Sequence, residues 1–275
     1  MQFTQPFVRN ALVATILLGC SVRAHADTIL WIDDTTGNIG QVDLTTLSVV
    51  AGSVHSTGLG SNLTDIGFTQ NGTLYGTTFT GLYSINKSTG ATTSLGSYGT
   101  EGGMNALVGD GASLLGAAND STKIYSINPA SPGSPATFAT SPADSAGDLA
   151  FSGPQLFESG VAINGNDELI NVSTDTVIGQ FHTTSQSAFT GVFGLADDGT
   201  TMYAVNGNTV YSVNLSTALL TEVLSYSGNT QGLGIANGTA FANEASNPAP
   251  EPSTIAVFGA AIAGLGALRG LRRAR

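Results

Sequence analysis

LYSINKSTGATT, residues 82–93, is one of five similar segments that decide how this chain folds. In each copy an alternating apolar strand ends at an Asn or Asp, and a turn rich in Ser and Thr follows. The other copies are IGQVDLTTLSVV (39–50), IYSINPASPGSP (124–135), DELINVSTDTVI (167–178) and VYSVNLSTALLT (210–221). The anchoring residues recur every 42 or 43 positions, which indicates a repeated structural unit. They are Asp43, Asn86, Asn128, Asn171 and Asn214.

Two further sets of short strands repeat in phase with these segments. One set is apolar and often carries an aromatic residue, as in TLYGTT (73–78) and TMYAVN (201–206). The other set is rich in small residues and ends at a Gly turn, as in DIGFTQNG (65–72) and GLGIANG (232–238). Asn-Gly and Asp-Gly pairs favour tight hairpins because these residues tolerate a positive φ. Each period therefore predicts four antiparallel strands, which is the blade of a β-propeller.

The number of blades follows from where the repeats begin and end. The first strand of the chain, TILWID (28–33), belongs to the second set, and GLGIAN (232–237) is the last strand of the small-residue set. This offset predicts that the C-terminal strand completes the N-terminal blade and closes a ring of five. TAFANE (239–244) is then one second strand too many, so six imperfect blades are an alternative. A β-sandwich or a β-helix is the other alternative for this all-β pattern.

The charge of the predicted propeller domain, residues 27–244, excludes nucleic acid as a partner. The chain has 275 residues, of which 41% are hydrophobic, enough to form a core. Residues 27–249 contain two lysines, no arginine and eighteen carboxylates, for a net charge of −16. Nucleic-acid binding needs cationic side chains that displace counterions. The only cysteine is Cys20, and the domain has only His55 and His182, so neither a disulfide nor a zinc site is predicted.

The first 26 residues are typical of a secretory signal peptide. Arg9 supplies the positive charge, residues 11–19 are apolar, and Ala24-His25-Ala26 is a small-x-small cleavage site. We expect export by the Sec machinery and cleavage between Ala26 and Asp27. Lipidation is an alternative, because Leu17-Leu18-Gly19-Cys20 resembles a bacterial lipobox in which Cys20 would become the first residue.

The C-terminal residues are predicted to form a membrane anchor. Residues 245–252 are a Pro-containing linker, and residues 255–268 are apolar and uncharged. Four arginines follow, which extend the effective span by snorkelling and place the tail in the cytoplasm. They are Arg269, Arg272, Arg273 and Arg275. We therefore expect a transmembrane helix with a basic tail over residues 253–275.

Together with Pro250-Glu251-Pro252, this anchor resembles the PEP-CTERM sorting signal of Gram-negative bacteria. That family's signal is recognised by exosortase, a membrane-embedded cysteine transpeptidase-like enzyme that processes its substrates near the motif. Such proteins typically occur in bacteria that make exopolysaccharide. The resemblance covers residues 250–275, and it implies a transient membrane anchor followed by a cell-surface or extracellular destination. It implies nothing about the activity of the repeat domain.

Candidate functional residues are those that the small-residue strands place near the central channel. These positions are Asp65, Asn105, Asp148, Phe193 and Gly232. The two carboxylates and the amide could hold a cation or a ligand, and Asp65 and Asp148 could act as an acid/base pair. Five-bladed glycosidases are similar in placing carboxylates near that axis. The competing interpretation is that these side chains hydrogen-bond neighbouring backbone.

The sequence therefore favours a non-enzymatic exported propeller that binds a glycan, such as exopolysaccharide, or a surface protein, or that has a structural role. The alternative is a glycan-active hydrolase or lyase that uses Asp65 and Asp148. No cofactor or metal site is predicted. The hairpin 33–38 superficially resembles a calcium loop, but it lacks the alternating acids and distal Glu of an EF-hand, so a hairpin turn is expected. Weak calcium binding on so acidic a surface is the alternative. Trp31 is expected to pack between blades, and Asp167-Glu168 to lie in a solvated turn.

Overall fold

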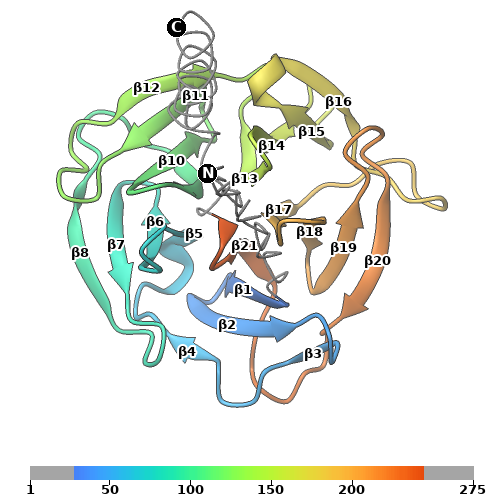
Figure 1. The fold of residues 1–275 in the computed structure, drawn as a ribbon, viewed down its shortest axis with the longest axis horizontal. Helices are drawn as coiled ribbons and strands as arrows, with labels where there is room; N and C mark the ends of the chain where they lie inside the picture. The colour runs from blue at the N-terminus through green and yellow to red at the C-terminus, as the bar shows by residue number, and fades with distance from the viewer. Residues whose placement is uncertain (1–27, 245–275) are drawn as a thin grey trace, which may run out of the picture.

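The computed structural model describes residues 28–244 and contains almost no helix. Its strands form five antiparallel sheets of four or five strands, arranged as blades around a central axis (Figure 1). The predicted five-bladed β-propeller is confirmed, and the six-bladed, sandwich and β-helix alternatives are wrong. Within the described range no helix is long and apolar enough to cross a membrane. The predicted signal peptide, linker and C-terminal anchor lie outside the described residues.

Each blade runs from an inner strand at the axis to an outer strand at the rim (Figure 1). Blade 1 contains β21 (Ala236–Phe241), β1 (Ile29–Asp34), β2 (Asn38–Asp43), β3 (Ser48–Val49) and β4 (His55–Ser56). Blade 2 contains β5 (Leu63–Phe68), β6 (Leu74–Thr78), β7 (Gly81–Ile85) and β8 (Thr92–Ser97). Blade 3 contains β9 (Met104–Asp110), β10 (Ser113–Ala118), β11 (Ser121–Ile127) and β12 (Ala136–Thr140).

The remaining two blades follow the same order. Blade 4 contains β13 (Ser145–Ser152), β14 (Gln155–Val161), β15 (Asp167–Asn171) and β16 (Thr176–Gln180). Blade 5 contains β17 (Val192–Asp197), β18 (Met202–Asn206), β19 (Thr209–Val213) and β20 (Leu220–Ser225). Two short 3-10 turns are η1 (Gly60–Asn62) and η2 (Val172–Thr174).

The repeated Asn or Asp forms a hydrogen-bonded turn between the third and outer strands of every blade. Its side-chain oxygen accepts from a backbone N–H two or three residues on, as Asn86 does from Ser88 at 2.9 Å. In three blades the residue four positions after the anchor is a non-glycine with a positive φ of 53–58°: Leu47, Asp175 or Ala218. An Asn or Asp side chain stabilises such a turn locally. The period of 42 or 43 residues therefore marks one turn in each blade.

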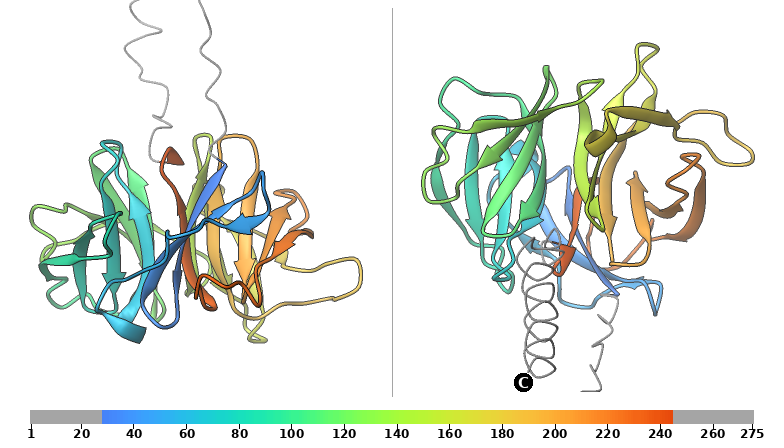
Figure 2. Two further views of the ribbon diagram at one scale, coloured as in Figure 1. Left: turned by 90° about the horizontal axis from the view of Figure 1, so that it is seen from below. Right: turned by 45° about the horizontal axis from the view of Figure 1, so that its top comes forward.

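Ring closure joins the two ends of the described chain within blade 1. β21 pairs antiparallel with β1, so that Leu30 lies opposite Phe241 and Asp33 opposite Gly238. The predicted closure by a C-terminal strand is confirmed. Residues 28 and 244 consequently lie at the same end of the channel, where the inner strands finish (Figure 2).

The closing strand was predicted at residues 232–237, about four residues before its observed position at Ala236–Phe241. The observed strand starts at Ala236, because the preceding residues form a loop that Asn229 organises. Its amide donates to the carbonyl of Leu233 at 2.7 Å and accepts from the N–H of Leu233 at 3.2 Å. Gly234 N–H donates to Asp34 at 2.8 Å. TAFANE is therefore not an extra second strand, because its first three residues belong to β21.

The core consists of apolar layers between neighbouring blades. One layer joins Leu115 and Ile124 of blade 3 to Leu149 and Ile170 of blade 4. Trp31 is 7% exposed and lies edge-on to Phe68, with ring centroids 5.8 Å apart, so its predicted packing role is confirmed. Apolar burial of this kind supplies most of the stability of a propeller.

Candidate functional site at the channel axis and mouth

Each inner strand has one residue near the axis that is equivalent to a residue in the other four inner strands. In every blade this residue follows a shift in the register between the inner strand and the second strand. The residue that resumes pairing is Asp65, Ala106, Asp148, Gly194 or Gly238. Two acidic side chains therefore share the axis with three positions that have little or no side chain. A Cβ built on Gly238 would collide with Asp65 Oδ1, so the space for these carboxyl groups depends on the small residues opposite them.

Asp65 connects blade 2 to blade 3. Its Oδ1 accepts from the N–H of Ile66 at 2.7 Å, and its Oδ2 accepts from the N–H of Leu107 in β9. The side chain is 0% exposed. Burial, followed by the neighbouring carboxyl groups of Asp148 and Asp33, raises the pKa of Asp65 well above its usual range.

Asp148 connects blade 4 to both blade 5 and blade 1. Its Oδ1 accepts from the N–H of Leu149 at 2.6 Å. Its Oδ2 accepts from the N–H of Leu195 at 2.7 Å, and from the N–H and hydroxyl of Thr239 at 3.2 Å each. Asp148 is also completely buried, and burial raises its pKa well above the usual range.

The structure brings Asp65 and Asp148 together near the axis, where each carboxyl group influences the pKa of the other. Two carboxyl groups that interact in this way titrate as a pair. Both are completely buried and accept hydrogen bonds from backbone N–H groups, whereas glycoside hydrolysis needs carboxyl groups about 5 Å or more apart with the sugar between them. This geometry supports the backbone-bracing interpretation, and a catalytic role for the pair stays a prediction that a turnover assay decides.

Asp33 is a third completely buried carboxyl group beside this pair. Its Oδ1 lies 2.6 Å from the position that a Cβ on Gly238 would take, and neither of its oxygens has a hydrogen-bond partner in residues 28–244. Burial and then the neighbouring charge of Asp34 raise its pKa well above the usual range. Burial therefore favours the protonated form of Asp33 over its ionised form.

One end of the channel opens into a cavity of about 300 Å³, here called the mouth cavity. It lies where the inner strands begin, opposite the end at which the described chain starts and finishes. Every inner strand or its leading residue contributes to its wall: Thr64, Asn105, Ser145, Phe193 and Asn237. Phe79, from the β6–β7 turn, also lines it and is 43% exposed.

Two buried polar atoms of the mouth cavity have no hydrogen-bond partner in the described part of the chain. They are Asn105 Oδ1 and Ser145 Oγ, on side chains that are 7% and 2% exposed. Asn105 uses only its amide N–H, which donates to the carbonyl of Ser145 at 3.1 Å. An unsatisfied buried polar atom costs about 1–3 kcal/mol, so a bound molecule that supplies the missing hydrogen bonds is favoured.

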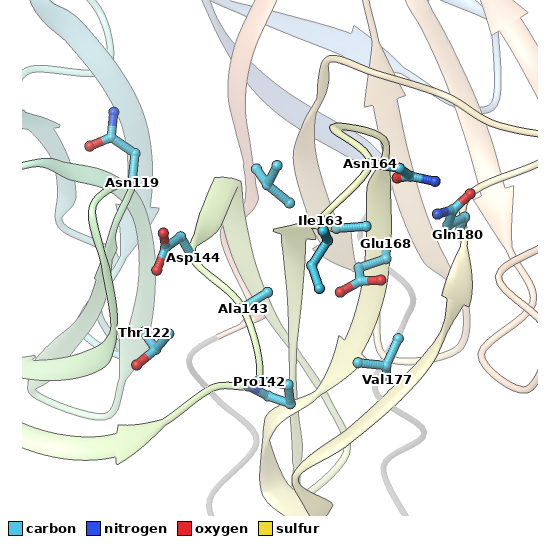
Figure 3. Close-up of a pocket in the computed structure, with 12 residues that line it drawn as sticks. Asn119, Thr122, Pro142, Ala143, Asp144, Ile163, Asn164, Glu168, Val177 and Gln180 are labelled. Atoms are coloured by element: carbon cyan, nitrogen blue, oxygen red, sulfur yellow. The ribbon is translucent and has the colours of Figure 1, made fainter.

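A larger cavity of about 910 Å³ adjoins the mouth cavity, and it is here called the blade 3–4 groove. Asn119 and Val161 line both cavities. Figure 3 shows Asn119 and Thr122 on the blade 3 side of this groove and Ile163 on the blade 4 side. The groove is thus a continuation of the mouth toward the rim.

The predicted channel positions fall into three groups. Asp65 and Asp148 lie inside the axis, whereas Asn105 and Phe193 lie at its mouth. Gly232 was wrongly placed at the channel, because it has a φ of 86° in the loop before β21. The strand that replaces it near the axis contributes Gly238 instead.

The hairpin 33–38 is a turn whose acidic oxygens are already occupied. Asp34 Oδ1 accepts from the N–H and hydroxyl of Thr36 and from the N–H of Asn38, and Oδ2 accepts from the Asn38 amide. Among the described residues no group of three or more His, Cys, Asp or Glu side chains is arranged to hold a metal ion. The donors around Asp34 leave its carboxylate no free position for calcium.

Asp167 was wrongly interpreted as part of a solvated turn. It is 4% exposed, begins β15, and accepts from the N–H of Val192 at 2.7 Å. Burial raises its pKa to about 6. Its neighbour Glu168 is half-buried in the wall of the groove.

Sequence reasoning missed the residues that line the groove and Phe79. Asp144 belongs to no repeated motif, and Glu168, although it lies in the repeated segment 167–178, was interpreted only as part of a solvated turn. Phe79 follows β6 at a position where the repeats share no residue type. A comparison of the β6–β7, β10–β11 and β14–β15 connections could have singled out these residues, because all three connections approach the same end of the channel.

No protein-family model and no curated protein matches this chain. Among solved structures, a chain of a nidogen/laminin complex is 12% identical, with 77% of this chain and 97% of that chain covered and a TM-score of 0.48. The WD40 domain of Neurospora crassa Pan2 is 14% identical, with coverages of 78% and 66% and a TM-score of 0.41. The computationally designed Ika8 protein is 17% identical, with coverages of 72% and 58% and a TM-score of 0.36. No shared function follows from identities this low.

Proposed function

We propose that this chain is an exported protein of the cell surface or extracellular matrix whose propeller binds a glycan at the mouth cavity. The observation that carries the proposal is the pair of unpartnered buried atoms, Asn105 Oδ1 and Ser145 Oγ, in a cavity that Phe79 and Phe193 also line. Sugar hydroxyls both donate and accept hydrogen bonds, and the C–H face of a pyranose packs on aromatic rings. The cavity offers both kinds of contact.

The orientation of the domain suits display of this site. The described chain begins and ends at the end of the channel opposite the mouth cavity. A tail that holds the protein at a membrane from residue 244 onward would therefore leave the mouth facing outward. This supports binding of extracellular polymers rather than of membrane components.

The mouth site predicts that single substitutions weaken glycan binding without unfolding the protein. We expect Asn105→Ala and Phe79→Ala each to weaken binding about tenfold, which corresponds to about 1.4 kcal/mol. The first removes an acceptor and the second removes an apolar platform. Isothermal titration of the purified full chain with soluble glucan, mannan, galactan and hexosamine oligomers measures the effect.

Phe138→Ala is the matched control, because Phe138 is 52% exposed on the outer strand β12 and lines neither cavity. Its binding should equal that of the unsubstituted chain, and the variants at the two exposed positions, Phe79→Ala and Phe138→Ala, should keep the melting temperature of the unsubstituted chain. Binding that survives both mouth substitutions, or the absence of binding to every oligomer tested, contradicts the proposal.

A glycan-active hydrolase or lyase is the alternative function, and the same oligomers separate the two. Asp65 and Asp148 do not line the mouth cavity. We therefore expect reducing ends and unsaturated products to stay at background while binding is measurable. Turnover that Asp148→Asn abolishes would reverse this conclusion.

Sorting by exosortase is the second part of the proposal, and residues outside the described range carry it. Pro250-Glu251-Pro252, the apolar stretch and the terminal arginines are the motivating features. In a bacterium that has exosortase, we expect the protein to reach the cell surface or the medium. Replacing the motif by three alanines, or deleting exosortase, should retain it in the membrane fraction. Equal release in all three strains, measured by immunoblot, would show that the tail is an ordinary anchor.

A further inference from the structure

We propose that the blade 3–4 groove extends the mouth site and selects glycan chains that carry free amino groups over chains that carry carboxylates. The inference rests on the proposed glycan binding at the mouth and names the class of glycan. It is carried by the continuity of the two cavities and by the charges that line the larger one.

The two cavities form one path from the axis toward the rim. Asn119 and Val161 belong to both walls. The unpartnered Asn105 Oδ1 and Ser145 Oγ lie at the axial end of this path. A polymer whose terminal sugar occupies the mouth therefore continues between blades 3 and 4. A single pocket at the axis would contact one sugar unit only, whereas this path contacts several units of an oligosaccharide and therefore favours it over a monosaccharide.

The groove has both apolar and hydrogen-bonding side chains, which match the C–H faces and the hydroxyl groups of a sugar chain. Ile163 is fully exposed, and Val161 and Val177 are 40% and 42% exposed. Amide side chains of Asn164 and Gln180 lie beside them (Figure 3). Aliphatic side chains pack on the C–H faces of pyranose rings, and amides donate to and accept from ring hydroxyls.

The charged groups lining the groove are both acidic. They are Asp144 and Glu168, and both lie in the space between the two blades (Figure 3). Of the basic residues in residues 28–244, Lys87 and Lys123, neither lines the groove. Partial burial raises the pKa of Glu168, because its charged form is less well solvated there than in water. A ligand ammonium group restores that lost solvation, and a uronate carboxylate is repelled.

The test compares matched oligomers on the purified full chain. Isothermal titration uses hexamers of β-1,4-linked glucosamine, of N-acetylglucosamine and of galacturonate, at low and at high NaCl. We expect glucosamine hexamers to bind at least about tenfold more tightly than the acetylated ones at low salt, and galacturonate hexamers not to bind. Because the preference comes from ion pairing, high salt should reduce it to within about twofold.

Two conservative variants locate the preference. Asp144→Asn and Glu168→Gln should each reduce the ratio of glucosamine to N-acetylglucosamine affinity by at least about threefold, while the affinity for the neutral hexamer stays unchanged. Glu222→Gln, on the exposed face of β20, is the control and should leave the ratio unchanged. If neither Asp144→Asn nor Glu168→Gln lowers the ratio of glucosamine to N-acetylglucosamine affinity, the assignment to the groove is overturned.

The outcomes separate this inference from the function on which it rests. If no hexamer binds, glycan binding itself fails. If the neutral hexamer binds as tightly as the amine form, or galacturonate binds more tightly than either, the mouth site stands and the amine preference is wrong. If oligolysine binds more tightly than the glucosamine hexamer and loses affinity in Asp144→Asn, the groove accepts cationic peptides, and the inference is overturned.

Discussion

Asp148→Ala is expected to lower the free energy of unfolding by about 3–5 kcal/mol, because it removes a buried acceptor that serves three blades. Its two oxygens accept from the N–H groups of Leu149 and Leu195 and from the N–H and hydroxyl of Thr239. Without the carboxyl group these donors are buried and unsatisfied, and the axis contains a void. Chemical denaturation at pH 5 measures the change.

Asp148→Asn tests whether the hydrogen-bond acceptors of Asp148 or its side-chain volume contribute more to the free energy of unfolding. Asparagine fills the same space, but it presents an N–H where Leu149 or Leu195 also donates, so we expect a loss of about 1–3 kcal/mol. Asp110→Ala is the matched control, since Asp110 is exposed at the end of β9, and it should change stability by less than about 0.5 kcal/mol. A loss of under about 1 kcal/mol for Asp148→Ala would contradict the bracing role.

The blade count could be predicted from the sequence because each repeat contains its own turn. Asn86 and its equivalents form local hydrogen bonds that need nothing from the rest of the molecule. The closing strand could not be placed, because GLGIAN and TAFANE both have strand-like patterns. The contact that decides between them joins Asp34 to Gly234, 200 residues apart. Long-range pairing of this kind leaves no local signal.

The candidate site, like the fold, has a part that the sequence predicted and a part that it did not. The repeat identified Asp65 and Asp148 as axial, and it placed Asn105 near the channel, one residue before the equivalent position Ala106. Their environments depend on what the other strands place opposite them. Gly238 leaves room for carboxyl groups at the axis, so those groups are buried there rather than exposed to a substrate. The groove could not be predicted, because Asp144 comes from a loop and Glu168 from a strand, and no repeat spacing relates the two positions.

The second large effect is a dependence of stability on pH that is opposite to ordinary acid denaturation. Buried acids with raised pKa values dominate this domain, and Glu158, with a pKa of about 8 against an ordinary 4.5, is one of them. Between these two values the folded chain keeps the proton and the unfolded chain loses it. The folded state then binds more protons, so rising pH favours unfolding. This contribution is fully present below about pH 4.5 and is lost as pH rises through about 8.

Asp34 acts in the opposite direction. Burial alone would raise its pKa, but hydrogen bonds from Thr36, Asn38 and Gly234 together lower it. Its contribution is present above about pH 4 and is lost at lower pH. Because Asp33, Asp65, Asp148 and Glu244 all have raised pKa values, the balance favours acidic solution. We expect the free energy of unfolding to be a few kcal/mol larger at pH 5 than at pH 8, by chemical denaturation at constant ionic strength.

Two isosteric variants show whether the buried acids cause this dependence. Glu158→Gln and Asp33→Asn remove ionisation while keeping volume, so each should raise stability at pH 8 by about 1–3 kcal/mol and change it little at pH 4.5. Asp34→Asn should instead destabilise the chain at pH 7, because a neutral amide accepts fewer of the hydrogen bonds that now reach Asp34. A chain that is more stable at pH 8 than at pH 5, or variants that leave the slope unchanged, would mean that these carboxyl groups find cations or water that compensate their burial.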